Sequence, residues 1–112
     1  MEDTCRAFLE ISLAENLIGK TINIGSGEEV SVNELFNKIN KIMNSDSKIK
    51  YESDRLRPKN SEVERLLADV NLLMDTTKFK RRFSLEEGLA CTVDWFTKKE
   101  NLNQYKTDIY NL

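Results

Sequence analysis

Apolar residues recur at helical spacing in several parts of the chain. Residues 4–18 carry a one-sided stripe that predicts an amphipathic helix ending near Gly19. Residues 31–43 and 84–97 each start with a capping box, Ser-x-x-Glu, and continue with a one-sided apolar pattern. We expect the first stripe to face the core; it comprises Cys5, Phe8, Leu9, Ser12, Leu13 and Leu17.

Other segments alternate between polar and apolar residues. Thr21–Ile24 is β-branched and alternating, and Lys48–Tyr51 alternates as an edge strand does. Glu62–Ala68 fits a short strand or a short helix, and residues 70–80 favour a helix. The pattern therefore predicts an α/β (α+β) fold: a small, few-stranded sheet with about four helices.

The stretch DRLRPKNSEVERLLAD, residues 54–69, concentrates three arginines, the chain's only proline and four acidic residues. Pro58 cannot donate to a sheet ladder, and it biases Arg57 toward extended backbone, so Asp54–Ser61 is predicted to be a loop. Two interpretations stay open from the residues alone: a solvated loop with weak surface ion pairs, or a surface that holds an anion.

Composition narrows the function further. The 112 residues suffice for one modest domain, and the net charge of −2 favours neither a nucleic acid nor a membrane as partner. No apolar run is long enough to span a bilayer and the first residues lack signal-peptide features, so we expect a cytoplasmic protein. No histidine is present, which excludes Ser-His and Cys-His nucleophile systems within the chain. Cys5 and Cys91 are predicted to be buried free thiols.

Four motifs occur in an order typical of one family: EDTCRAFLEISLAE, GKTINIGSGEEVSVNELFNKI, RPKNSEVERLLAD and SLEEGLACTVDWF. Together they resemble the C-terminal, substrate-binding part of extended short-chain dehydrogenase/reductases, the NAD(P)-dependent nucleotide-sugar epimerases and 4,6-dehydratases. The Arg-Pro stretch is most similar to the dehydratase branch. The chain departs from the family near residues 70–83, where a Gly-aromatic-x-Pro step is usual and Lys78–Phe83 stands instead.

The family's catalytic features are missing from the sequence. There is no Gly-x-x-Gly-x-x-Gly cofactor loop, and none of the three tyrosines has a lysine four residues on. The resemblance therefore implies a fragment: residues 1–97 as the substrate-binding lobe without its Rossmann domain, and residues 98–112 as a polar tail. It implies no catalytic residue, metal or cofactor site here, with NAD(P) bound by the parent enzyme, so whether this chain is itself an enzyme stays open.

The resemblance also gives the charged stretch a role. In this sequence the resemblance implies that Arg57 would hold the diphosphate of a UDP-, GDP- or dTDP-sugar. Glu62 would bind the ribose hydroxyls, and Arg55 would be a second phosphate contact. A guanidinium offers paired donors that match phosphate oxygens, and a carboxylate accepts from a vicinal diol. The missing Rossmann domain would be the other partner.

Competing interpretations remain at this stage. The chain could instead be a stand-alone, non-enzymatic module that binds a nucleotide or a protein. Gly25–Gly27 reads as a turn rather than a phosphate cradle, because no lysine stands at the P-loop position. Lys78–Arg82 could bind RNA, but a solvated basic face is favoured because the run is short and the chain is acidic.

Overall fold

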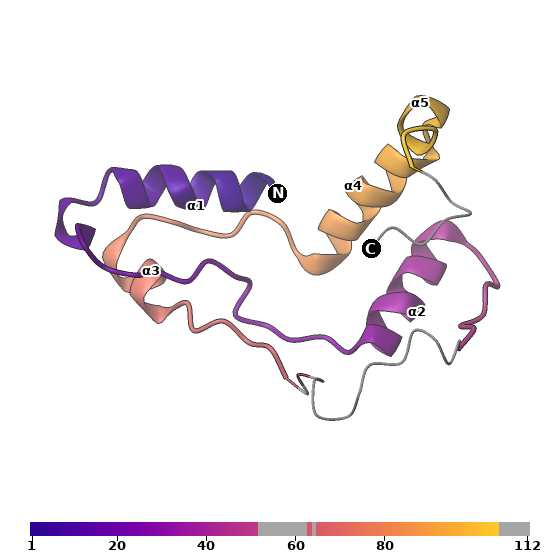
Figure 1. The fold of residues 1–112 in the computed structure, drawn as a ribbon, viewed down its shortest axis with the longest axis horizontal. Helices are drawn as coiled ribbons and strands as arrows, with labels where there is room; N and C mark the ends of the chain where they lie inside the picture. Colours follow the sequence, from indigo (N-terminus) through magenta and orange to yellow (C-terminus); the bar gives the residue numbers. More distant parts are fainter. Residues whose placement is uncertain (52–62, 64, 106–112) are drawn as a thin grey trace. The chain divides into compact units, whose positions relative to one another are not determined.

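The structure, a computed structural model, describes residues 1–51, 63 and 65–105. The chain divides into two compact units: Met1–Ser31 with Lys48–Arg82 (unit 1), and Val32–Ser47 with Phe83–Leu112 (unit 2). The helices of the described part are α1 (Glu2–Ser12), the 3-10 helix η1 (Glu15–Leu17), α2 (Val32–Met43), α3 (Asn71–Thr76), α4 (Leu85–Thr97) and α5 (Lys99–Leu102) (Figure 1).

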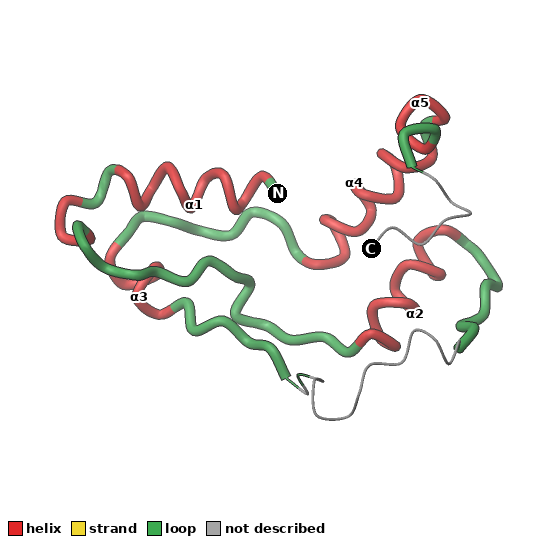
Figure 2. Tube along the Cα trace, viewed as in Figure 1, coloured by secondary structure: helices red, strands yellow, loops and turns green. Residues whose placement is uncertain are grey.

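The expected sheet is absent from the described residues, so the predicted α/β (α+β) fold class is wrong (Figure 2). Thr21–Ile24 nevertheless keeps the predicted alternation, because Ile22 and Ile24 are half-buried against the core of unit 1 while their neighbours are exposed. Burial of every second side chain requires only an extended backbone that lies on an apolar surface. It does not require a second strand to pair with. Lys48–Tyr51 is also neither helix nor strand.

The core of unit 1 joins three parts of the chain that are far apart in sequence. Ala7 of α1 and Leu73 of α3 are fully buried, and Phe79 is 5% exposed. Ile11, Ile22 and Ile24 pack around them. Figure 1 shows the segment that follows α3 running beside α1, as this shared core requires.

The first helix is confirmed, but its orientation was predicted wrongly. Ala7 and Ile11 face the core, whereas Phe8 and Leu9 of the predicted core stripe are 63% and 61% exposed. The spacing identifies an apolar stripe but does not tell which of two apolar faces is covered. The helix also ends earlier, at Ser12, and Gly19 follows η1 with a φ of 76° instead of capping α1.

Gly25 is required by a close approach within unit 1. A Cβ atom at this position would lie 2.8 Å from the Cβ of Ala68, closer than real Cβ contacts allow. Gly27, with a φ of 69°, lies against Val70 on the same segment. The predicted turn at Gly25–Gly27 therefore forms as a bend that rests on the chain leading into α3.

Unit 2 is built on α2 and α4, which pack together and are joined by an ion pair between Lys38 and Glu86. The end of α2 has a Schellman motif: Ser45 donates to Asn40 O at 3.0 Å and Asn44, at a φ of 49°, donates to Lys41 O.

The start of α4 confirms its predicted capping box. Ser84 Oγ accepts from the Glu87 amide at 3.2 Å, and the Glu87 carboxylate accepts from the Ser84 amide at 2.7 Å. The carboxylate also accepts from the Ser84 hydroxyl, so four polar atoms at the helix start are paired locally.

Replacing Leu73 tests the core of unit 1. Leu73→Ala should lower the free energy of unfolding by about 2–4 kcal/mol, because it removes a fully buried side chain and leaves a cavity. The neighbouring Leu72 is 37% exposed, so Leu72→Ala is a matched control that should cost about 1 kcal/mol or less. Urea unfolding followed by circular dichroism measures both, and equal losses would contradict the described core.

Removing the cap tests α4. Ser84→Ala should destabilise the chain by about 1 kcal/mol at neutral pH, because an amide of the first turn loses its acceptor. Hydrogen bonds from the Ser84 amide and hydroxyl lower the pKa of Glu87 in the folded chain. The ionised carboxylate therefore stabilises the fold fully above its unfolded-state pKa, and this stabilisation is lost as the pH falls through the lowered folded-state pKa. The difference between the variant and the wild type should therefore shrink in acid; Ser12→Ala, at the end of α1, is the control and should show no such trend.

Candidate functional site

The three predicted substrate-binding residues, Arg55, Arg57 and Glu62, lie outside the described residues. The structure therefore leaves their roles as predictions. It does describe the segment that follows them in sequence, from Arg65 to Val70, and the contacts that hold this segment in unit 1.

Two contacts attach that segment to the loop that follows Thr21. The Asn23 side-chain amide donates to the Asp69 carbonyl at 3.3 Å, and Arg65 Nε donates to Glu29 Oε2 at 3.1 Å. The second guanidinium nitrogen of Arg65 binds the other carboxylate oxygen, so the pair is bidentate. The side chain of Arg65 is still 74% exposed, which leaves the pair open to solvent.

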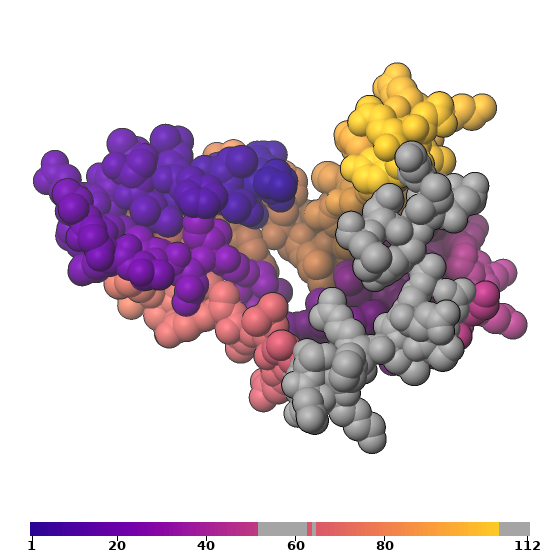
Figure 3. Space-filling view, viewed as in Figure 1, coloured from indigo at the N-terminus to yellow at the C-terminus, as the bar shows by residue number. Residues whose placement is uncertain are grey.

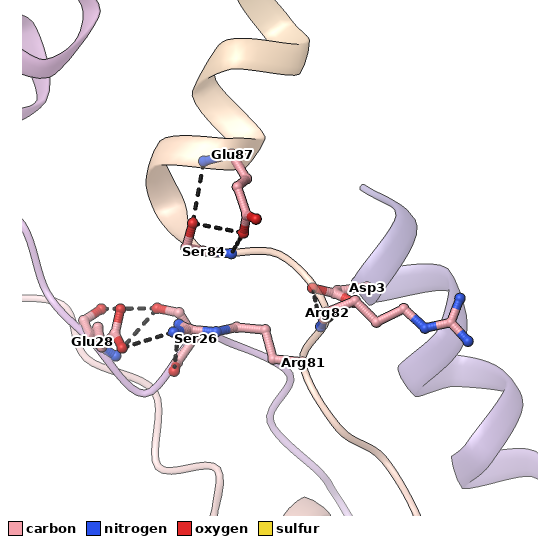
Figure 4. Close-up of polar contacts among 7 residues, drawn as sticks. All are labelled: Asp3, Ser26, Glu28, Arg81, Arg82, Ser84 and Glu87. Carbon is pink, nitrogen blue, oxygen red and sulfur yellow. Dashed lines mark hydrogen bonds and ion pairs between the residues drawn. The ribbon is translucent and has the colours of Figure 1, made fainter.

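The Ser26–Glu29 bend is held by a second arginine (Figure 4). Ser26 Oγ accepts from the Glu28 amide at 3.2 Å and its hydroxyl donates to the Glu28 carbonyl, which closes the bend on itself. Arg81 donates to the Glu28 carboxylate at 2.8 Å and to the Ser26 carbonyl at 3.3 Å. Because this guanidinium satisfies a side chain and a backbone oxygen together, it fixes the bend more tightly than an ion pair alone would.

The backbone of the basic run near residue 80 is anchored, while Lys78, Lys80, Arg81 and Arg82 are exposed, as the predicted solvated face requires. The Arg82 amide donates to both Asp3 carboxylate oxygens at 3.1 Å, and Arg6 donates to the Lys80 carbonyl at 3.0 Å. Together with the Arg81 contacts, these bonds attach the run to α1 and to the bend. Sequence reasoning missed this role because the acidic partners lie more than fifty residues away.

Two pKa shifts in unit 1 belong to these ion pairs. Hydrogen bonding to Glu28 raises the pKa of Arg81, and hydrogen bonding to Glu29 raises the pKa of Arg65. Both guanidinium groups therefore stay charged at any physiological pH. Such groups hold anions or fix loops, and they do not transfer protons.

Unit 2 contains an apolar groove of about 590 Å³. Its lining residues are Ile39, Met43, Leu89, Thr92, Val93, Phe96, Thr97 and Leu102. The two threonine hydroxyls donate to carbonyls of their own helix, Gly88 O and Asp94 O, so the groove walls are almost wholly apolar. Phe96, part of the apolar pattern of residues 84–97, is 37% exposed.

An aromatic cluster borders the groove. The rings of Trp95 and Phe96 meet edge to face at 4.9 Å, and Tyr105 packs on Phe96 with the ring centroids 5.1 Å apart. The chain beyond Thr97 is thus docked on α4 as far as Tyr105, while the division between residues 1–97 and 98–112 stays a prediction.

The described residues hold no metal-binding cluster: residues 1–51, 63 and 65–105 contain no group of three or more His, Cys, Asp or Glu side chains that could bind an ion. Cys5 and Cys91 are free but exposed, so the prediction of buried thiols is wrong. Among these residues no helix has the length and apolar character needed to cross a membrane.

Three curated proteins are similar to most of this chain. UDP-N-acetyl-α-D-glucosaminuronate decarboxylase of Bacillus cytotoxicus is 33% identical over 92 residues, 80% of this chain and 29% of the enzyme. A trifunctional UDP-glucose 4,6-dehydratase/UDP-4-keto-6-deoxy-D-glucose 3,5-epimerase/UDP-4-keto-L-rhamnose-reductase of Arabidopsis thaliana is 32% identical over 102 residues, 87% of this chain and 14% of the enzyme. A putative UDP-glucose 4-epimerase of Methanocaldococcus jannaschii is 31% identical over 83 residues, 74% of this chain and 26% of that protein.

These similarities support the resemblance to nucleotide-sugar enzymes of the short-chain dehydrogenase/reductase type. The chain spans less than a third of each relative's length. No protein-family model matches the chain, and no solved structure matches it.

The pairs Arg81–Glu28 and Arg65–Glu29 should differ in how much each stabilises the fold. Arg81→Gln should lower the urea midpoint of unfolding clearly, because it removes the contacts to Glu28 and Ser26 from a side chain that is 34% exposed. Arg65→Gln should change the midpoint little, because its pair with Glu29 is more exposed and weakened by solvent. A larger loss for Arg65→Gln would contradict this ranking.

Proposed function

We propose that this chain is the nucleotide-sugar-binding part of an NAD(P)-dependent nucleotide-sugar epimerase or dehydratase, and that it grips the nucleoside diphosphate without catalysing a reaction alone. The observation that carries the proposal is the similarity of 74–87% of the chain to parts of three proteins named for UDP-sugar substrates. The lobe would be residues 1–97, followed by the tail at 98–112.

Arg57 is the proposed diphosphate contact, supported by Arg55, with Glu62 as the acceptor for ribose hydroxyls. A guanidinium can donate two parallel hydrogen bonds to phosphate oxygens and stays ionised, and Pro58 restricts the backbone beside it. A restricted backbone loses less entropy when a ligand binds.

The described part of unit 1 supports this assignment through two contacts that hold the chain downstream of the proposed site. Arg65 is bound to Glu29, and Asp69 accepts from both Asn23 and, through its side chain, the amide of Asn71. The chain that leaves the proposed site is therefore held at two points within eight residues of Glu62. A binding site loses less conformational entropy on ligand binding when the chain that follows it is already held in place.

The chemistry of the parent reaction would lie elsewhere. The sequence contains neither the Gly-rich cofactor loop nor the Tyr-x-x-x-Lys pair of the family. The parent enzyme would supply the redox chemistry through NAD(P) bound elsewhere, while this part would orient the substrate through its diphosphate. The purified chain is therefore expected to bind nucleotide sugars and to leave them unchanged.

Calorimetric titration of the purified chain with UDP-glucose, GDP-mannose and dTDP-glucose tests the proposal. Binding of at least one is expected, and Arg57→Ala should weaken it about tenfold or more, because a hydrogen bond to a charged group contributes about 1.5–3 kcal/mol. Arg82→Ala is the matched control, since its guanidinium is 63% exposed and its nearest acidic partner is Glu2 at 4.0 Å.

Two results would contradict the proposal. Absence of binding at millimolar ligand would contradict the proposed function. Equal binding by the wild type and Arg57→Ala would contradict the proposed site. Binding of UDP-sugars in preference to the other two would agree with the relatives' names.

A further inference from the structure

Among its described residues, unit 2 has no buried core. No residue of α2 or α4 is buried, whereas unit 1 buries Ala7, Leu17, Leu73 and Phe79. Helices of this length owe most of their stability to the packing of an apolar face, because isolated helices shorter than about 12–15 residues are marginal in water. The packing of α2 on α4 therefore leaves the apolar faces of both helices incompletely covered.

The uncovered surface is the apolar groove of unit 2. Of its lining residues, Met43 is 53% exposed, Leu102 43% and Phe96 37%. The hydroxyl groups of its two threonines donate to carbonyls of α4, so they are already satisfied. An occupant would meet almost only apolar atoms, and a polar group placed there would lose its hydrogen bonds to water without gaining others. The groove therefore suits apolar side chains.

The chain itself returns to this groove after α5. The Asn101 side-chain amide donates to the Trp95 carbonyl at 2.8 Å, which holds α5 against the end of α4. Tyr105 packs on Phe96, a residue of the groove wall, with the ring centroids 5.1 Å apart. Figure 3 shows the yellow atoms beyond Thr97 lying against the orange atoms of α4. The described part of the chain therefore ends at the edge of the groove.

The segment that follows, residues 106–112, has the composition and the reach to fill the groove. It includes three apolar or aromatic residues, Ile109, Tyr110 and Leu112. Its seven residues can extend over about 23 Å, whereas the part of α4 that lines the groove is only about 12 Å long. A segment tethered at the edge of the groove also has a millimolar effective concentration there, which favours it over a second copy of the chain.

We propose that residues 106–112 dock in the groove of unit 2 and complete its core, with side chains from Ile109, Tyr110 and Leu112 against the walls. The end of the segment that the sequence predicts to be a polar tail is then a structural part of unit 2. The inference is independent of the proposed function, because the residues assigned to substrate binding belong to unit 1. A failed sugar titration therefore leaves it intact.

Nuclear magnetic resonance on the full 112-residue chain tests the docking directly. Methyl groups of Ile109 or Leu112 should give nuclear Overhauser contacts to methyl groups of the groove wall, which carries Ile39, Leu89 and Val93. Such contacts arise only between protons that lie close in space, so they identify the occupant without any substitution. In a sample that mixes labelled and unlabelled chains, the contacts should arise within one molecule.

Matched substitutions in the same segment provide a second test. Ile109→Asp/Leu112→Asp should undock the segment, because a carboxylate is costly to place in an apolar groove. Binding of the dye anilinonaphthalene sulfonate, which reports exposed apolar surface, should then rise severalfold. Thr107→Asp/Asn111→Asp adds the same charge at polar positions of the segment, and it should leave dye binding near the wild-type level. Circular dichroism of both variants checks that the helices persist.

Three results overturn the inference. The first is the absence of contacts between methyl groups of the segment and those of the groove wall in the wild-type chain. The second is an equal rise in dye binding for both double substitutions. The third is contacts that arise only between molecules, which would assign the groove to the segment of a second copy. If Ile109→Asp/Leu112→Asp loses its helices, the contacts in the wild-type chain alone decide.

Discussion

The burial of Leu73 against Ala7 and Phe79 is the contact on which the rest of unit 1 depends. It joins α1 to α3 and to the segment after α3, across more than sixty residues of sequence. With α1 and residues 77–82 held by this contact, Asp3 can accept from the Arg82 amide, and Arg81 can reach Glu28. The apolar core thus sets the geometry, and the polar contacts around it fix the loops.

Among the residues that the structure describes, the ion pairs of Arg65 and Arg81 fix chain segments. Arg81 and Arg65 each bind a glutamate of one short bend, and the resolved pKa shifts favour the charged forms. The more exposed Arg65 pair contributes little to stability by itself, whereas Arg81 also holds a backbone oxygen of the bend.

Local sequence signals predicted local structure well. The capping box at Ser84 identified the start of α4, because both of its partners lie within one turn. The Gly25–Gly27 bend followed from glycine alone. The helix over residues 70–80 was predicted too long, because α3 ends at Thr76. The hydroxyl of the next residue, Thr77, donates to the Leu73 carbonyl at this end.

Long-range features could not be predicted from the sequence. Alternation at Thr21–Ile24 was taken for a paired strand, although it reports only one covered face, and the pairing partner is a matter of tertiary structure. The stripe on α1 was assigned to the core because the second apolar face, Ala7 and Ile11, is the smaller one. The proposed ligand contacts at Arg55, Arg57 and Glu62 rest on the family resemblance, since the described residues do not include them.

The meeting of Gly25 with Ala68 has a consequence for how this sequence can vary. The two positions share a space that admits a single methyl group, because a Cβ on Gly25 would lie 2.8 Å from the one already on Ala68. A side chain gained at either position must be given up at the other. In related proteins that keep this bend, the residues at positions 25 and 68 should therefore change together, although no local sequence pattern connects the two positions.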